Sequence, residues 1–307
     1  MFIVNHRKLF FGIAGLLVLG SIVSGMVFGL HFGLDFTGGS LLEVSFPQGR
    51  PSLEEAKARL DTLTAPDLGD YTIRPSGDSS FVLRSKTLAP AEKTVVVTAL
   101  AGGDQDSVVE QRFNSVGPTV GDSLKQKSYY AIIAVIIGIV LFITFAFRKV
   151  SQPVASWKYG LATIVALAHD VIIPGGIYLV YCYFTGAEID LLFVTALLAI
   201  LGYSVHDTIV VFDRVREHLR INNEYRTVEP FEKTVGESVM QTMGRSINTS
   251  LTIFIVLIAL YFVGSETTRN FSFVLLVGVI FGTYSSIFIA SPLLVTLEKL
   301  QGNKEKK

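Results

Sequence analysis

LLFVTALLAILGYSVHDTIVVFDRVREHLR, residues 191–220, is the stretch of this 307-residue chain that decides its fold. It begins as an apolar run of the length that a helix needs to enter a bilayer. Further along it carries His206, Asp207 and Arg214, with residues 209–212 still apolar between the charges. Asp207 is therefore expected at membrane depth, where an ionisable side chain is costly unless it faces protein, a partner or water. The stretch predicts a membrane-spanning helix that carries a functional carboxylate.

Helical spacing leaves two interpretations of these charges. Asp207, Val210, Val211 and Arg214 share one face of a helix, because neighbours on a face lie three or four residues apart. In the first interpretation Asp207 and Arg214 simply pair with each other at the end of the helix. In the second, Asp207 is a functional group that another helix or water approaches.

The composition of the whole chain supports a membrane protein. Half of the residues are hydrophobic and the mean hydropathy is +0.50. Basic and acidic residues balance at 26 each, so the net charge gives no indication of nucleic-acid binding. The single cysteine, Cys182, excludes a disulfide within one chain and is expected to be a small buried hydrophobe.

Six apolar runs can each supply the roughly 20 residues of a spanning helix. They lie at 9–29, 129–147, 159–184, 189–212, 246–264 and 271–297. We therefore predict a polytopic α-helical membrane protein with six transmembrane helices. The predicted divisions are an N-terminal segment with the first helix at 1–30, an outer domain at 31–128, a five-helix bundle at 129–300 with a cytoplasmic loop at 213–245, and a cytoplasmic tail at 301–307.

Basic residues predict the orientation of these helices. If the N-terminus is cytoplasmic, the inner segments hold most of the lysines and arginines that flank the spans, whereas the two short outer loops hold only Arg269. Both termini are therefore expected in the cytoplasm, and residues 31–128 are expected outside, in the periplasm. Residues 1–30 are expected to stay as an uncleaved helix, because the apolar run is too long for a signal peptide and no A-x-A site follows it.

The outer segment has the periodicity of a small α+β domain. Strands are expected at 41–46, 71–74, 81–84 and 108–116, and helices at 51–63 and 90–101. This βαββαβ order is the ferredoxin-like arrangement. It contains no paired carboxylates, histidine cluster or phosphate loop in the sequence, which favours a lever or a binding surface over a catalytic domain.

Polar residues recur inside the other predicted spans. The third span is expected to be interrupted at Pro174, four residues after the pair His169 and Asp170. This pair either joins helices structurally or belongs to a polar relay, and spacing alone does not decide between them. In the fifth span Arg245, Asn248 and Thr249 form one polar face.

Two further stretches have mainly structural explanations. Residues 229–243 are amphipathic, which predicts a helix that lies on the membrane surface or against a partner. Residues 31–40 contain Gly33, Gly38 and Gly39, which suit a turn with unusual backbone angles at the exit from the membrane.

Several of these stretches resemble the SecF branch of the SecD/SecF family of protein-export membrane proteins, within the resistance–nodulation–division superfamily. The most specific is 202–214, and it is accompanied by 33–39, 116–121, 168–170 and 245–250. The resemblance extends from the first span to the last. It implies that the intramembrane aspartate of the family falls on Asp207 and its arginine on Arg245. His206 departs from the family pattern, which usually has asparagine there.

The resemblance implies a multi-pass subunit of the bacterial cytoplasmic (inner) membrane that pairs with SecD and works with the SecYEG channel, YajC and, indirectly, SecA. Such a subunit uses the proton-motive force, or sodium in some members, to complete preprotein translocation. It needs no cofactor beyond the coupling ion, and it is neither an enzyme nor a nucleic-acid-binding protein. The residues of the family's outer motif are Asp35, Phe36, Thr37, Gly38 and Gly39.

The hypothesis that follows is an ion-driven bundle that moves an outer domain. Asp207 binds and releases a proton, Arg245 holds its ionised form, and Ser204, Asn248 and Thr249 line the path. A moving arginine changes the proton affinity of a buried carboxylate, so it can act as a switch. Two rivals remain: a passive assembly subunit in which every charge is structural, and half of a small-molecule exporter. An intramembrane enzyme is disfavoured because no HExxH, serine elbow or metal-binding histidine cluster is present in the sequence.

Overall fold

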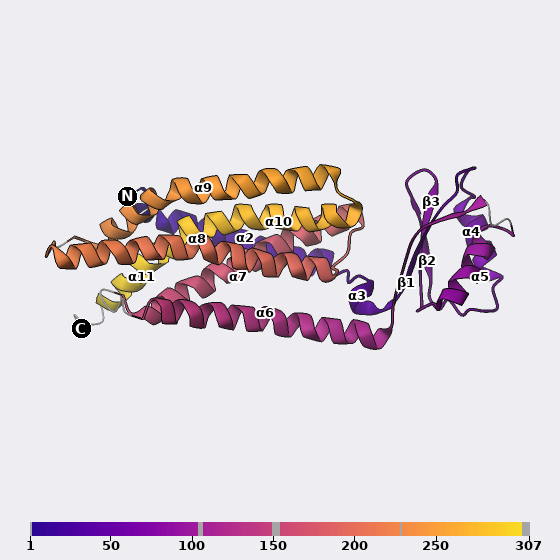
Figure 1. The fold of residues 1–307 in the computed structure, drawn as a ribbon, viewed down its shortest axis with the longest axis horizontal. Helices are drawn as coiled ribbons and strands as arrows, with labels where there is room; N and C mark the ends of the chain where they lie inside the picture. Colours follow the sequence, from indigo (N-terminus) through magenta and orange to yellow (C-terminus); the bar gives the residue numbers. More distant parts are fainter. Residues whose placement is uncertain (1, 104–106, 149–153, 228, 303–307) are drawn as a thin grey trace. The chain divides into compact units, whose positions relative to one another are not determined.

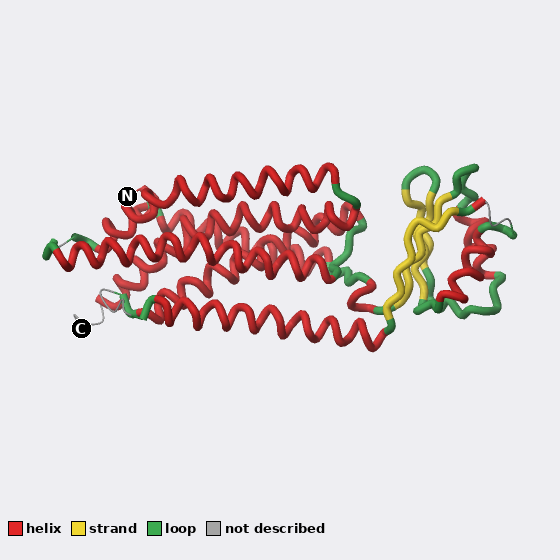
Figure 2. Tube along the Cα trace, viewed as in Figure 1, coloured by secondary structure: helices red, strands yellow, loops and turns green. Residues whose placement is uncertain are grey.

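The computed structural model describes residues 2–103, 107–148, 154–227 and 229–302. The chain divides into two compact units, one formed by Met1–His31 with Tyr130–Lys307 and the other by Phe32–Tyr129. Figure 1 labels their helices and strands, and Figure 2 separates the all-helical unit from the one that contains the sheet. Of the predicted inner segments, residues 149–153 and 303–307 lie outside the described residues.

Six helices are long and apolar enough to cross a membrane, which confirms the predicted class of fold. They are α2 (Arg7–Phe28), α6 (Pro118–Ala146), α7 (Ser156–Thr185), α8 (Leu191–Glu224), α9 (Phe231–Val263), and a last span in which α10 (Glu266–Ser285) continues through the π-helical segment η2 (Ser286–Ala290) into α11 (Ser291–Gly302). A short helix, α1 (Phe2–Asn5), precedes them. The observed helices extend beyond most of the predicted apolar runs, because charged residues continue the helical pattern outside the apolar core.

Helices α7, α8 and α10 form the interior of the membrane unit. In the apolar stretch of each helix, about half of the residues are buried in α7 and in α8 (56% each), whereas only 6% are buried in α6 and 17% in α2 and in α9. Helix α10 packs against α7, α8 and α9, and α2 packs against α7. The unburied apolar faces of α2, α6 and α9 are therefore available to lipid or to another membrane subunit.

Two predictions about the helices were wrong. Helix α7 continues through Pro174, so the third span is not interrupted. Residues 231–243 do not form a separate surface helix, because they are the first turns of α9. Phe231, Val235 and Val239 are buried in one hydrophobic cluster with residues of α8 such as Val211. The amphipathic face is thus covered by the chain itself, and burying it there stabilises the long helix.

The second unit contains the predicted βαββαβ order, which is confirmed. Its elements are α3 (Leu34–Thr37), β1 (Gly39–Ser45), α4 (Leu53–Asp61), β2 (Thr72–Ser76), β3 (Ser80–Ser85), α5 (Pro90–Leu100) and β4 (Val109–Val116). The antiparallel sheet has the order β2-β3-β1-β4, as in ferredoxin-like domains. Alternate strand residues pack against the two helices around Leu42, Val44, Phe81, Leu83, Ala56, Leu60, Val96 and Leu100.

Local sequence explains where the two helices of this unit begin. Ser52 caps α4: its hydroxyl accepts from the Glu55 backbone amide, and the Glu55 carboxylate accepts in return from the Ser52 amide. Helix α5 has Pro90 at its first turn, where a missing amide hydrogen costs nothing. The strands are longer than predicted at the hairpin, because edge strand β2 tolerates Pro75.

Candidate functional site

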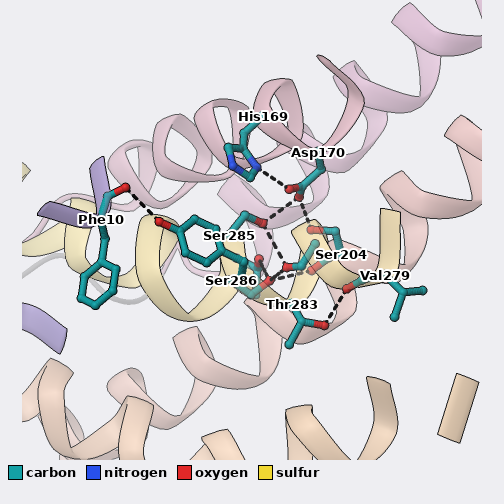
Figure 3. Close-up of polar contacts among 11 residues, drawn as sticks. Phe10, His169, Asp170, Ser204, Val279, Thr283, Ser285 and Ser286 are labelled. Carbon is teal, nitrogen blue, oxygen red and sulfur yellow. Dashed lines mark hydrogen bonds and ion pairs between the residues drawn. The ribbon is translucent and has the colours of Figure 1, made fainter. Parts of the chain in front are cut away.

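A cluster of buried polar side chains joins three helices in the interior of the membrane unit (Figure 3). Asp170 of α7 is completely buried. Its Oδ2 accepts hydrogen bonds from the hydroxyl groups of Ser204 of α8 and, at 2.8 Å, Ser285 of α10. Its Oδ1 lies 2.9 Å from Nδ1 of His169, which is also buried. Such donors offset the cost of burying the carboxylate.

Further hydroxyl groups extend this cluster along α8 and α10. The Ser286 hydroxyl lies 2.9 Å from that of Thr208 and donates to the Ser204 backbone carbonyl at 3.2 Å. On another side of α8, Tyr203 donates to Ser250 of α9 at 2.7 Å. The hydrogen bonds therefore tie α8 to α9 as well as to α7 and α10, all within the apolar interior.

Backbone irregularities lie at the same place as the cluster. Pro174 lacks an amide hydrogen, so it cannot donate to the backbone carbonyl of Asp170 four residues earlier. The π-helical segment of the last span begins at Ser286, one residue after Ser285. Such segments are frequent at functional sites. Gly278 lets α10 approach α8 closely, because an added Cβ would lie 2.2 Å from Ile200 Cδ1.

Asp207 lies on α8 one turn beyond Ser204 and is only 3% exposed. Its Oδ2 has no hydrogen-bond partner among the described residues. Ser246 of the neighbouring helix α9 acts on this carboxylate, and so do His206 and Arg245. Arg214 instead binds Glu217 at 2.5 Å, and its Nε donates to Gln241. The alternative in which Asp207 pairs with Arg214 is therefore wrong.

The remaining predicted residues of the path lie at the surface of the membrane unit. Arg245, Asn248 and His206 are exposed, and Thr249 is partly buried with its hydroxyl donating to the Arg245 carbonyl at 3.0 Å. None of these four side chains joins the Asp170 cluster in the part of the chain that the structure describes. A charged face on an apolar helix needs water or a partner to cover it.

The predicted outer motif forms a short helical turn followed by two glycines, within the second unit. Residues 34–37 make the single turn α3, in which Phe36 is buried and the Thr37 hydroxyl donates to the Gly33 carbonyl at 3.1 Å. Gly38 and Gly39 follow with positive φ angles of 70° and 111°. A Cβ at Gly38 would lie 2.9 Å from Pro118 Cα, at the start of α6. These contacts explain Gly38 and Gly39 by backbone geometry; Asp35 lies in the same turn.

Among the described residues, no three histidine, cysteine or acidic side chains are grouped as metal ligands would be.

Sequence reasoning missed the partners on the last span. Ser285, Ser286, Thr208 and Ser250 were not predicted, because small polar residues in apolar helices have a sufficient explanation in close helix packing. A signal was present in the adjacent pair Ser285 and Ser286, since two neighbouring serines face two different helices.

Comparison with known proteins identifies the family. A profile for the C-terminal part of the protein export membrane proteins SecD/SecF matches residues 95–300, and one for the SecD/SecF GG motif matches residues 23–46. Protein translocase subunit SecF of Thermobaculum terrenum is 40% identical, with 96% of this chain and 93% of the relative covered. The SecF subunit of Anaerolinea thermophila is 37% identical, with 96% and 94% covered.

Proteins in which SecD and SecF are fused are also similar. SecDF of Brucella abortus is 34% identical over 87% of this chain, which spans 33% of that protein. The crystal structure of SecDF from Thermus thermophilus, described as a translocon-associated membrane protein, matches with a TM-score of 0.75 and 28% identity over 96% of this chain and 38% of that one. The chain therefore belongs to the SecD/SecF family of protein-export membrane proteins, among the translocase subunits of the SecF type.

Proposed function

We propose that this chain uses the proton-motive force to complete the translocation of preproteins, in a complex with SecD. The observation that carries the proposal is Asp207, a carboxylate buried at membrane depth whose Oδ2 has no hydrogen-bond partner among the described residues. Burying an acceptor without a donor costs free energy, and binding a proton removes that cost. The coupling ion is H⁺, with Na⁺ as the alternative.

In the proposed cycle Asp207 binds a proton from one side and releases it to the other. The charge of Arg245 on the neighbouring helix α9 acts on the ionised form, so a change in its distance alters the proton affinity. Asn248 and Thr249 of the same face would line the water path. A proton that moves down about 100 mV gives roughly 2.3 kcal/mol, which is enough to bias a two-state movement of the outer unit.

The proposed setting is the bacterial cytoplasmic membrane with both termini inside, because the basic residues flank the inner ends of the spans. The fused SecDF relatives support SecD as the partner. The exposed polar face of α9 is the surface that we assign to it. The SecYEG channel, YajC, SecA and the preprotein are the further proposed partners. The role is transport, and no enzymatic step is assigned.

The experiment is preprotein release in membrane vesicles that contain this chain with its SecD partner. Asp207→Asn keeps the side-chain volume but removes the titration, so we expect it to abolish the stimulation of release by a proton gradient. The matched control is Asp213→Asn on the same helix, where the carboxylate is half exposed and pairs with Arg216. If the proton gradient still stimulates release in Asp207→Asn while the complex is intact, the proposal is wrong.

A second candidate is a passive scaffold, favoured by the hydrogen-bond donors that surround Asp170 and tie α7, α8 and α10 together. This alternative requires Asp207→Asn to lose function only when the complex with SecD is lost. Co-purification of the variant with SecD therefore separates the two candidates.

A further inference from the structure

The histidine beside Asp170 has an unsatisfied acceptor. Asp170 makes three hydrogen-bond contacts, with His169, Ser204 and Ser285. All three form together when Asp170 is ionised and Nδ1 of His169 carries a hydrogen, because an ionised carboxylate accepts every one of them. In this neutral imidazole Nε2 is a bare acceptor. It is buried and has no hydrogen-bond partner among the described residues. A buried lone pair without a donor carries a desolvation penalty, and binding a proton there removes that penalty.

The pair is linked to α8, the helix of Asp207, through the Asp170 carboxylate, which accepts from the Ser204 hydroxyl. Ser204 donates to Asp170 and lies three residues before Asp207, so both face the same side of α8 about one turn, or roughly 5 Å, apart. Thr208, next to Asp207, is joined to Ser286, which in turn donates to the Ser204 carbonyl. Hydroxyl groups thus line the helix between the two aspartates.

We propose that His169 and Asp170 form a second proton-binding pair that acts in series with Asp207. This inference rests on the proposed function and adds a step to it. The pair lies where α7, α8 and α10 are held together. Pro174 and the π-helical segment, where the helical backbone is irregular, lie next to it.

The proton balance of the step is simple. A proton that leaves the Asp207 carboxyl group binds Nε2 of His169 and forms an imidazolium that the Asp170 carboxylate stabilises. If the imidazolium then passes its Nδ1 hydrogen to Oδ1 of Asp170, the products are a neutral carboxylic acid and a neutral imidazole with its hydrogen on Nε2. Asp170 then loses one of its acceptor contacts at Oδ1, so the contact between the side chains changes with the protonation state.

Few other ionisable groups face His169. Tyr284 of α10 stacks on the imidazole with ring centroids 5.8 Å apart, and its hydroxyl donates to the Phe10 carbonyl of α2. Asp207 and Tyr203 belong to α8. In the described parts of α2, α6 and α11 that lie within the apolar core (residues 9–28, 131–147 and 291–296), the sequence contains no ionisable side chain. Asp170 is therefore the ionisable group that the structure places in hydrogen-bond contact with His169.

The first test observes the wild-type protein directly. In the complex with SecD in lipid bilayers, ¹⁵N-labelled histidine distinguishes a bare from a protonated ring nitrogen by NMR. We expect His169 to show a hydrogen on Nδ1 and a bare Nε2 at about pH 8, and to carry a hydrogen on both ring nitrogens when the medium is acidified to about pH 5. His169→Asn assigns the signal, and exposed His31→Asn serves as the control. A histidine signal that stays unchanged across this range overturns the proposal.

The second test measures proton flux against pH in vesicles. His169→Asn leaves a side-chain amide at the position of Nδ1, which still donates to Asp170, but removes the second titrating nitrogen. We expect flux to fall on the order of 100-fold and its pH profile to lose one ionisation. His31→Asn, with its exposed side chain in a loop, should keep the wild-type profile.

The outcomes separate this inference from the proposed function. If Asp207→Asn abolishes flux while His169→Asn keeps the wild-type rate and profile, the pair is structural and only this inference fails. If both variants keep wild-type flux, the proposed function fails and this inference fails with it.

Discussion

At the scale of residues, two buried aspartates of one bundle differ in their surroundings. Asp170 is surrounded by hydrogen-bond donors from three helices, whereas Oδ2 of Asp207 has no partner among the described residues. The sequence could identify both, because an ionisable residue in an apolar run is unusual. It could not assign Ser204 to Asp170 instead of Asp207, because that choice depends on how α7 and α8 are rotated against each other.

Removal of one donor to Asp170 is expected to destabilise the bundle. Ser285→Ala deletes the hydroxyl that donates to Asp170 Oδ2 at 2.8 Å in a fully buried place. The loss should be about 1–3 kcal/mol, because the carboxylate keeps its burial but loses a partner. Thermal unfolding of the protein in detergent measures it. Ser265→Ala is the control and should change little, because its exposed hydroxyl pairs with that of Thr268 and lies outside the buried cluster.

A second prediction at this scale concerns Tyr71 in the second unit. Burial, together with the hydrogen bond that its hydroxyl donates to Asp61, raises the pKa of Tyr71 to about 12 from 10.0. A raised pKa means that the contribution to stability is complete below about pH 10 and is lost as the pH rises through about 12. Unfolding midpoints measured across this window should fall more steeply for the wild type than for Tyr71→Phe. Equal slopes would contradict the assignment.

At the scale of elements, the helices of the bundle were predictable and their ends were not. The apolar runs locate all six spans, but α8 and α9 extend far beyond them because apolar residues such as Val215 and Val235 pack against each other outside the spans. Periodicity indicates that one face of the amphipathic segment before Arg245 is buried, but it does not show that the chain itself covers this face.

Close packing of α10 on α8 gives a prediction for these elements. Gly278→Ala places a methyl group 2.2 Å from Ile200 Cδ1, so the helices must separate or rearrange. We expect a loss of about 1–3 kcal/mol and weaker coupling between the helices. Gly138→Ala on α6, where no atom lies within 4 Å of the added Cβ, is the matched control. A Gly278→Ala variant as stable as Gly138→Ala would contradict the packing described for α10.

At the scale of the whole molecule, the chain consists of two units with separate cores. Alternating strand residues and helix signals predicted the βαββαβ order of the second unit, because each element there follows its local pattern. The polar cluster of the membrane unit could not be assembled in this way. It is made of residues from 169 to 286 that only the packing of three helices brings together.

The separate core of the second unit predicts independent folding. Residues 32–129, produced as a soluble fragment, should unfold cooperatively in urea with a stability of about 5 kcal/mol or more, because the sheet and both helices bury one continuous cluster. Circular dichroism follows the transition. A fragment that lacks a cooperative transition would show that this unit needs the membrane unit to fold.

The measurement that tests the central claim most directly is proton uptake into sealed vesicles that contain the chain with SecD, driven by an imposed membrane potential. A dye enclosed in the vesicles reports the internal pH. The account predicts acidification with the wild type and with Asp213→Asn, and none above the protein-free leak with Asp207→Asn, although all three complexes are equally abundant. Acidification by Asp207→Asn at the wild-type rate would contradict the assignment of Asp207 as the ion-carrying residue.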